Sequence, residues 1–314
     1  IDPRNGQVLA MVSVPTFDPN LFVNGISQHD YDALLHDPGK PLLHRALRGG
    51  YPPGSTIKPF LGLGGLELGL RTPEDTVYST GVFHIPGQSR GYRDDRRGGF
   101  GRVDLVQAIA KSVNTYFYKL AYDMGIDKFS HWMARFGFGK PTGIDLDGEG
   151  SGVLPSREWK RGHRSQPWYP GETVIAGIGQ GYWVVTPLQL AHAVAMLADR
   201  GVPHRPHLLK ATQQGVDAAI NPQPPVKPGG SVVKHLDDWK AVRKGMLQVV
   251  YGGPGSTARG LGDNFPYLIA GKTGTAYKAQ ADGTYFNADG ITHDYYSSFV
   301  GFFPAEDPQV TILI

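Results

Sequence analysis

Three features of the sequence predict an α+β domain with a mainly antiparallel central sheet. Apolar strand candidates lie near both ends of the chain, turn sequences adjoin them, and helical patterns fill the middle. We expect a sheet part at about residues 1–50 and 230–314, flanked by helices, and a helical subdomain at about 55–225. With 314 residues, the chain is long enough to bury a substantial core as one domain.

The strand candidates are short apolar segments next to turn residues. Near the start, an Asp-Pro-Arg-Asn-Gly turn leads into residues 7–13, which are apolar enough for a buried strand. Residues 267–277 form another candidate. Near the end, residues 296–303 and 309–314 flank a Pro-bounded turn, which is typical of an antiparallel pair.

Start signals and apolar spacing predict three helices between these strands. Thr186 supplies an N-cap hydroxyl before a proline at the first helical position, and an apolar run follows. Asp104 opens a shorter helix that should end near Lys111. Apolar residues recur at helical intervals over 236–250. The Pro/Gly-rich residues 221–230 then connect the helical part to the sheet.

Composition excludes several classes of function. Hydrophobic residues make up 40% and charged residues 19%, as in ordinary globular proteins. The formal net charge of +3 is mild, so no nucleic-acid partner is expected. We interpret the Arg-rich residues 90–102 as a solvated loop; the alternative is a loop attracted to an anionic polymer. Without cysteines, the chain has no disulfide, thiol nucleophile or Cys-based zinc site.

The two ends suggest that the chain is part of a longer protein. It begins at Ile1 without a methionine and stops inside an apolar run. No apolar run approaches the length of about 18 residues that a membrane span needs, and no signal peptide opens the chain. The lack of an anchor in this segment therefore does not describe the parent protein.

Ser55 and Lys58 are a candidate nucleophile and base. They follow a Pro-Pro-Gly turn and precede a nearly all-apolar segment, which predicts that Ser55 begins a buried helix. Residues three apart share a helix face, so Lys58 is expected to reach the Ser55 hydroxyl. Lowering the pKa of the lysine by three units takes about 4 kcal/mol, which burial and a second cation can supply. Backbone N–H groups at the helix start can also stabilise an oxyanion.

A second pair of polar residues follows the short helix. Ser112 and Asn114 are two residues apart on a non-helical segment, so their side chains should point the same way. The hydroxyl can relay a proton, and the amide can hold a substrate amide.

This pair matters because Ser-x-x-Lys alone is a weak signal. Residues 231–234 repeat that motif after the connector, and we interpret the second copy as structural.

The third element is Lys272-Thr273-Gly274-Thr275, inside the apolar strand candidate at 267–277. A lysine is costly in such a strand, and a strand glycine often marks the close approach of a ligand. Lys272 is expected to be the second cation that lowers the pKa of the first lysine and to attract a substrate carboxylate. The alternative is an edge-strand lysine whose ammonium group reaches solvent.

In this order, the three motifs resemble those of the serine penicillin-recognising enzymes, the penicillin-binding proteins and serine β-lactamases. The segments that look like the class B transpeptidases are 5–13, 51–60, 179–182, 186–189 and 271–276. The segments most similar to the elongation-specific branch of that class are 122–127, 157–160 and 167–169. The resemblance covers essentially the whole chain. It implies the penicillin-binding-protein/serine β-lactamase-like fold, without the family's membrane anchor and stalk region.

The resemblance also implies a reaction. Ser55 would be the acylated nucleophile and Lys58 its general base. Ser112 would pass the proton to the leaving D-alanine, and Asn114 would bind the peptide amide. The implied function is a peptidoglycan D,D-transpeptidase, in which an amine of a second stem peptide takes the acyl group from the serine. β-Lactam antibiotics would acylate the same residue.

Substrate binding is assigned by the same resemblance to the strand motif. Lys272, Thr273 and Thr275 would hold the terminal carboxylate of the D-Ala-D-Ala stem peptide, and Gly274 belongs to this substrate-binding segment. The backbone N–H groups of Ser55 and Thr275 would form the oxyanion hole. No cofactor is expected.

The resemblance further implies a cellular location and protein partners. The parent protein would be anchored in the inner membrane, with this domain in the periplasm. It would take part in cell wall biogenesis and the maintenance of cell shape, together with a membrane elongation glycosyltransferase and scaffold proteins.

Three alternative functions remain open. A D,D-carboxypeptidase differs only in its acceptor. A class A β-lactamase needs a glutamate with an asparagine four residues later, and none of Glu149, Glu158 and Glu172 has one. A non-catalytic β-lactam sensor, a binding module, would be acylated once and then signal.

Two other patterns are candidates for a nucleotide-binding loop and a metal site. The glycine-rich residues 177–181 lack the preceding strand and the Lys-Ser/Thr of a nucleotide loop, so residues 180–183 are expected to pack below the nucleophile instead. Four possible metal ligands match no known spacing, so no metal site is predicted: His84, Asp94, Asp95 and His293. The polar residues 277–295 would flank the groove and become ordered with substrate.

Overall fold

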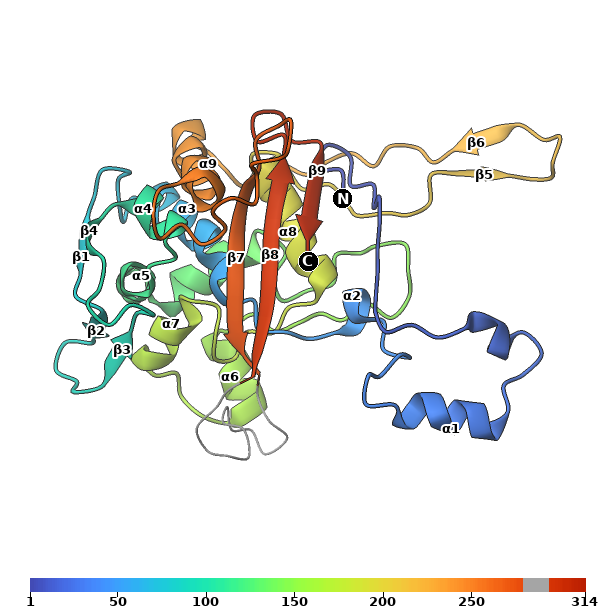
Figure 1. Cartoon of the computed structure of the whole chain (residues 1–314), viewed down its shortest axis with the longest axis horizontal. Coiled ribbons are helices and arrows are strands. Elements are labelled where there is room, and N and C mark those ends of the chain that lie inside the picture. The colour runs from blue at the N-terminus through green and yellow to red at the C-terminus, as the bar shows by residue number, and fades with distance from the viewer. Residues whose placement is uncertain (279–293) are drawn as a thin grey trace.

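The computed structural model describes residues 1–278 and 294–314. One three-stranded antiparallel sheet in the order β7-β8-β9 lies in front of the helices, with α8 (Pro187–Ala198) behind it and most other helices on the β7 side (Figure 1). These strands are β7 (Ala270–Tyr277), β8 (Tyr295–Phe303) and β9 (Val310–Leu313). The predicted strands at the C-terminal end and the α+β class are therefore confirmed. The segment that was expected to flank the groove lies almost entirely outside the described residues.

The first residue of the chain also pairs with this sheet. The Ile1 amino group donates to Thr311 O at 2.9 Å, and Thr311 N donates to Ile1 O at 2.7 Å. The predicted buried strand over residues 7–13 is wrong. Gln7 forms an isolated parallel bridge with His207 instead, in which Val8 N donates to His207 O at 2.9 Å. The chain then leaves the body, with Val12 75% exposed. An apolar segment without a neighbouring strand cannot form a ladder.

The core is built on helices α3 (Lys58–Glu67), α5 (Asn114–Ala134) and α8 (Pro187–Ala198). Every residue of α3 except its last, Glu67, is buried, as its apolar sequence predicts. Gly64 is required there, because a Cβ at this position would lie 2.6 Å from the Trp132 ring.

The predicted helix starts are confirmed. Asp104 caps α4 (Leu105–Ala110) in a complete capping box, and Thr186 caps α8. Helix α9 (Leu236–Tyr251) contacts α3, α4 and β7. Sequence reasoning missed α5, in which Gly125 has a φ of 71° and kinks the helix.

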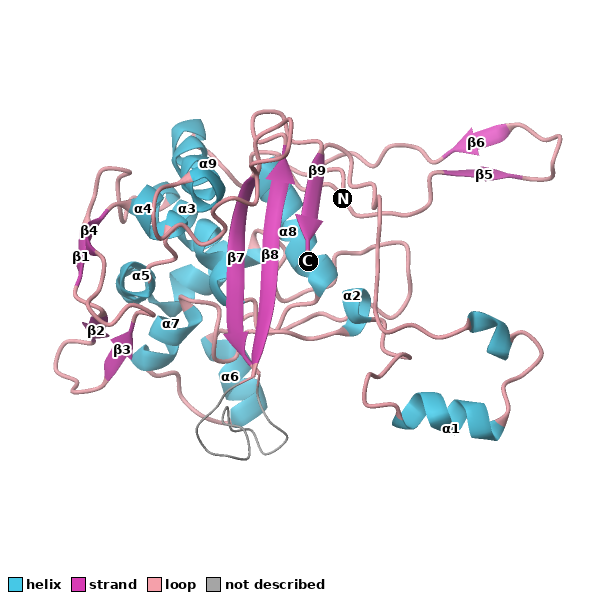
Figure 2. Cartoon of the chain, viewed as in Figure 1, coloured by secondary structure: helices cyan, strands magenta, loops and turns pink. Residues whose placement is uncertain are grey.

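The remaining elements are short or peripheral. The other helices are η1 (Pro19–Phe22), α1 (Gln28–His36), α2 (Arg45–Arg48), η2 (Gly54–Ile57), α6 (Arg157–Arg164) and α7 (Pro170–Ala176). The other strands are β1 (Val77–Ser79), β2 (Val82–His84), β3 (Gly91–Arg93), β4 (Gly101–Val103), β5 (Ala211–Gln213) and β6 (Ile220–Pro222). The β5–β6 hairpin and the segment with α1 extend away from the body (Figure 2). Among the described helices, none is long and apolar enough to cross a membrane.

The Arg-rich segment is more ordered than a solvated loop. It contains β3 and β4, and Asp94 between them is buried. The Asp94 carboxylate accepts hydrogen bonds from Ser79 Oγ at 2.8 Å, Thr115 N at 3.0 Å and Thr115 Oγ1 at 2.6 Å. This carboxylate therefore fixes the segment against the start of α5.

Candidate active site

Ser55 lies in the short 3-10 helix η2, which runs directly into α3. Gly54, with a φ of 55°, precedes it and donates its N–H to Gly179 O at 2.9 Å. A Cβ on Gly54 would lie 2.5 Å from Thr275 O. The nucleophile turn is thus held between β7 and Gly179. Of residues 180–183, which were expected to pack below the nucleophile, Gln180 lines the cleft beside it, whereas Trp183 is buried in the core.

Lys58 is fully buried below the cleft. Its Nζ donates to Ser112 O at 2.7 Å, Ser112 Oγ at 3.0 Å and Asn114 Oδ1 at 2.6 Å. Among the described residues its hydrogen bonds go to these two partners and not to Ser55. Burial lowers the pKa of Lys58 to about 7, against the opposing effect of the Asp95 carboxylate. About half of the amine is therefore neutral near pH 7.

Ser112 and Asn114 reach the same ammonium group from the junction of α4 and α5. Ser112 has a φ of 56°, a left-handed conformation that costs a non-glycine residue on the order of 1 kcal/mol. This conformation directs both its carbonyl and its hydroxyl to Lys58. Val113 between them is fully buried, so the two-residue spacing does place the polar pair on one side.

The lysine of β7 is also fully buried, so it is not a lysine that reaches solvent. Lys272 Nζ donates to Thr273 O at 2.9 Å, and Thr273 Oγ1 donates to Thr257 Oγ1 at 2.8 Å. Burial, and then repulsion from Lys58, lowers the pKa of Lys272 well below its usual value. The pKa of Lys58 is lowered by burial and raised in part by Asp95 and Asp94. Lys272 is not among these causes, so its expected role as the second cation is not supported.

Gly274 is required by the protein's own packing. A Cβ there would lie 2.7 Å from Thr56 Cγ2 and 2.4 Å from Ser298 Oγ. The glycine lets β7 lie directly against the nucleophile turn. Gly274 also lines the cleft, so the close approach of a ligand to its backbone stays a prediction.

A cleft of about 590 Å³ opens beside these elements. Its lining residues are Ser55, Arg93, Asp95, Ser112, Asn114, Tyr118, Ile178, Gln180, Thr257, Thr273, Gly274, Thr275, Tyr277, Tyr295, Ser297 and Ser298. The structure thus brings six of the eight sequence-predicted site residues to one wall. The other two, Lys58 and Lys272, lie buried behind it. The volume suits a small peptide or a comparable ligand.

Several lining residues were not predicted as site residues. Thr257 lies in a Gly/Pro-rich loop, and no local pattern brings it to the cleft. Arg93 and Asp95 belong to the segment interpreted as a solvated loop. Gln180 donates to Thr275 O at 3.4 Å and lines the cleft beside the nucleophile turn. The resemblance at residues 179–182 was the signal that could have identified it.

The rejected metal candidates do not gather in the described structure. Asp94 is occupied by its three hydrogen bonds, His84 is exposed, and His293 lies outside the described residues. One other group of possible ligands does occur among the described residues, at the far end of α3, and it does not line the cleft.

Comparison with known proteins finds one family model that matches the whole chain. The family described as "Penicillin binding protein transpeptidase domain" matches residues 1–314. The chain is 43% identical over 315 residues to "Peptidoglycan D,D-transpeptidase MrdA" of Escherichia coli (strain K12), covering 99% of this chain and 49% of that protein. It spans about half the length of the curated relatives it matches.

Two solved structures are also similar. Pseudomonas aeruginosa PBP2 in complex with WCK 5153 matches with a TM-score of 0.87 and 46% identity, over 100% of this chain and 64% of that one. PBP2 in its complex with MreC from Helicobacter pylori matches with a TM-score of 0.84 and 32% identity, over 100% and 55%.

Proposed function

The chain belongs to the penicillin-binding protein transpeptidase family, and from that premise we propose that it is a peptidoglycan D,D-transpeptidase that works through an acyl-enzyme on Ser55. One observation carries the assignment of the residues. A fully buried lysine with a pKa of about 7 is hydrogen-bonded to Ser112 and Asn114 behind the wall of the cleft that contains Ser55.

Acylation begins with removal of the Ser55 proton. Neutral Lys58 has a lone pair, and it is three residues from Ser55 at the junction of η2 and α3. The Ser55 oxygen attacks the carbonyl carbon of the penultimate D-Ala and forms a tetrahedral intermediate, while Lys58 gains the proton. The proton then passes through Ser112 Oγ, 3.0 Å from Lys58 Nζ, to the nitrogen of the leaving D-Ala. The C–N bond breaks and the ester on Ser55 remains.

The strand β7 supplies recognition. We assign the oxyanion hole to the backbone N–H groups of Ser55 and Thr275, which belong to segments in direct contact. The hydroxyl groups of Thr273 and Thr275 bind the terminal carboxylate. Lys272 does not line the cleft, so it is a positioning residue that acts through its hydrogen bonds to Thr273. Thr257 holds the Thr273 hydroxyl from the other side.

An amine from a second stem peptide completes the reaction. It attacks the ester carbonyl and gives up a proton to Lys58. Lys58 passes this proton to the Ser55 oxygen as the ester C–O bond breaks, so the new peptide bond is formed and the Ser55 hydroxyl is restored. Water in place of the amine gives the carboxypeptidase outcome. No glutamate lines the cleft among the described residues, which argues against the water-activating arrangement of a class A β-lactamase. β-Lactams enter the same reaction and stop at the ester.

The setting of the whole protein is part of the proposal. The relatives are about twice as long as this chain, and we propose that the parent carries an inner-membrane anchor that holds this domain in the periplasm. The H. pylori relative, solved with MreC, supports a scaffold protein as a partner. A membrane glycosyltransferase of wall elongation is the second partner that we propose.

Turnover of a D-Ala-D-Ala peptide or its thioester analogue tests this function. We expect release of the terminal leaving group, faster when a D-amino acid is added as acceptor, with a product that contains the acceptor. Release with only the hydrolysed product would make the domain a carboxypeptidase. Acylation by penicillin without any peptide turnover in the full-length protein would make it a sensor. Rapid penicillin hydrolysis would make it a β-lactamase.

A further inference from the structure

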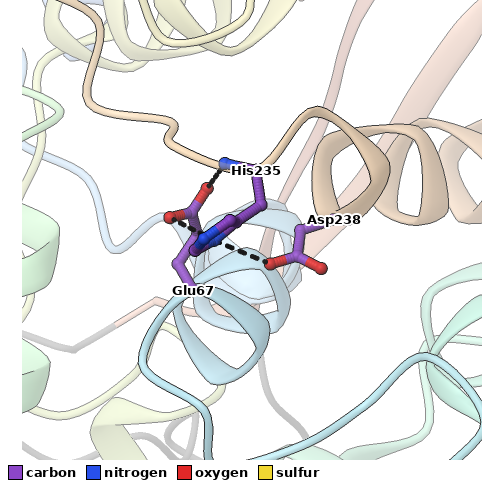
Figure 3. A group of neighbouring side chains, drawn as sticks. All are labelled: Glu67, His235 and Asp238. Atoms are coloured by element: carbon purple, nitrogen blue, oxygen red, sulfur yellow. Dashed lines mark hydrogen bonds and ion pairs between the residues drawn. The ribbon is translucent and has the colours of Figure 1, made fainter.

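A glutamate, a histidine and an aspartate meet where α3 ends and α9 begins (Figure 3). Glu67 is the last residue of α3, His235 immediately precedes α9, and Asp238 lies in the first turn of α9. His235 Nδ1 lies 3.4 Å from Glu67 Oε2 and 3.7 Å from Asp238 Oδ2. One ligand atom from each residue lies within 4.8 Å of the other two.

The Glu67 carboxylate is the unusual member of this group. Its side chain is only 1% exposed. One oxygen, Oε1, accepts hydrogen bonds from Lys234 N at 2.7 Å and His235 N at 2.9 Å. The other, Oε2, is buried and accepts no hydrogen bond from any described residue, although it points at the imidazole (Figure 3). A buried carboxylate oxygen without a donor is costly, so a cation at this position would be stabilising.

The charges of the group also favour a cation. The carboxylates of Glu67 and Asp238 both lie next to the imidazole of His235. The group thus offers carboxylate oxygens and a ring nitrogen, which are common ligands of divalent transition metals. No lysine or arginine is paired with either Glu67 or Asp238 among the described residues.

The distances and donor types fit a first-row transition metal. Ligand atoms 2.0–2.1 Å from a tetrahedral Zn²⁺ are separated from one another by about 3.4 Å. The two distances from His235 Nδ1, 3.4 Å and 3.7 Å, are close to this value. Imidazole suits Zn²⁺ and related ions, whereas Ca²⁺ and Mg²⁺ take oxygen ligands.

We infer that Glu67, His235 and Asp238 form a binding site for a divalent transition-metal ion such as Zn²⁺, with water at the remaining position. None of the three lines the cleft. The ten residues of α3 separate them from the nucleophile turn by about 15 Å. The ion therefore takes no part in acyl transfer. It joins the end of the core helix α3 to α9, which itself contacts β7.

Zinc titration of the untagged protein, stripped with a chelator, tests this site. Calorimetry should give one Zn²⁺ per chain. The variants Glu67→Gln, His235→Asn and Asp238→Asn should each bind at least about tenfold more weakly. Zinc at about 100 times its Kd should raise the Tm of the unsubstituted protein by several degrees, on the order of 5 °C, and should raise it less in these variants.

Two substitutions are matched controls. Asp237 lies beside Asp238 in the same turn, but it is 90% exposed and pairs with Lys240 at 2.8 Å. His29 is 93% exposed and lies beside Asp30 on the surface. Asp237→Asn and His29→Asn should bind zinc as the unsubstituted protein does. Asp238→Asn leaves the Glu67 hydrogen bonds to the start of α9 in place, so it should stay folded, as circular dichroism can check.

Four results would overturn the inference. The first is the absence of saturable binding at micromolar Zn²⁺. The second is equal loss of binding in the control variants. The third is anomalous scattering from a zinc-soaked crystal at a position away from the three side chains. Binding of Mg²⁺ that survives His235→Asn would also contradict a transition-metal site, since the imidazole would then not be a ligand.

Discussion

At the scale of single residues, the proposed mechanism requires that the amine of Lys58 is neutral when it accepts the Ser55 proton. Lys58 is kept near a pKa of about 7 mainly because it is buried. Its three hydrogen bonds to Ser112 and Asn114 use all the donors of an ammonium group. After the proton is lost, the nitrogen can accept a hydrogen bond from Ser112 Oγ, so the same contact serves both protonation states.

The pH dependence of acylation follows from this pKa. A general base acts in its neutral form, so the acylation rate should rise about tenfold per pH unit below pH 7 and level off above it. Stopped-flow measurement of penicillin acylation between about pH 5.5 and 9 checks this. Lys58→Met should lower the rate by about 10²- to 10⁴-fold above pH 7, and the difference should shrink at lower pH, where Lys58 is protonated. A flat profile, or a fast Lys58→Met variant, would contradict the role of the lysine.

Residues that belong to short motifs could be identified from their local spacing in the sequence. The order of Ser55, Ser112 and Lys272 in the chain was enough to group three motifs that the fold brings to one cleft. Residues that reach the cleft through a contact distant in sequence could not be identified in this way. Thr257 reaches Thr273 across sixteen residues of sequence, and nothing in its own loop indicates this hydrogen bond.

At the scale of elements, the site depends on how closely β7 lies against η2. Gly274 permits this contact, because any side chain there would meet Thr56 and Ser298. The sequence indicates a close approach to this glycine, but it does not identify the nucleophile turn as the neighbour. A glycine shows that something lies close to the backbone; only the tertiary structure shows that it is the nucleophile turn.

Gly274→Ala should therefore damage the reaction more than the fold. Displacing β7 from Ser55 by about 1 Å should slow acylation by up to about 100-fold, and overpacking should cost about 1–3 kcal/mol. Gly253→Ala is the control, since a Cβ there meets nothing within 4 Å. Acylation rates and chemical denaturation of both variants give the comparison. Equal rates for the two would show that the contact does not position the serine.

The helices show which element signals are reliable. The starts of α4, α8 and α9 were predicted, because caps and apolar spacing act within a few residues. Helix α5 was missed, and its kink at Gly125 interrupts the local pattern. The strand expected at residues 7–13 was wrong, because its formation depends on a partner strand that this fold does not place beside it.

At the scale of the whole molecule, the two chain ends meet in the sheet while the motifs converge from distant segments. Ile1 pairs with Thr311, 310 residues away. Between them, the nucleophile turn, the α4–α5 junction and β7 each contribute residues to the cleft. Fold class, family and six of the residues that line the cleft were accessible from the sequence. The hydrogen-bond partners of both lysines and the group at the end of α3 required coordinates.

The measurement that tests the central claim most directly is intact mass after incubation with a penicillin. We predict one stable adduct on the unsubstituted protein and on Ser231→Ala, which removes the serine of the second Ser-x-x-Lys copy. We predict no adduct on Ser55→Ala. Ser231 is exposed and its hydroxyl donates to Arg200 O at 2.8 Å, so its loss should leave the fold intact. An adduct that persists in folded Ser55→Ala would contradict the assignment of the nucleophile.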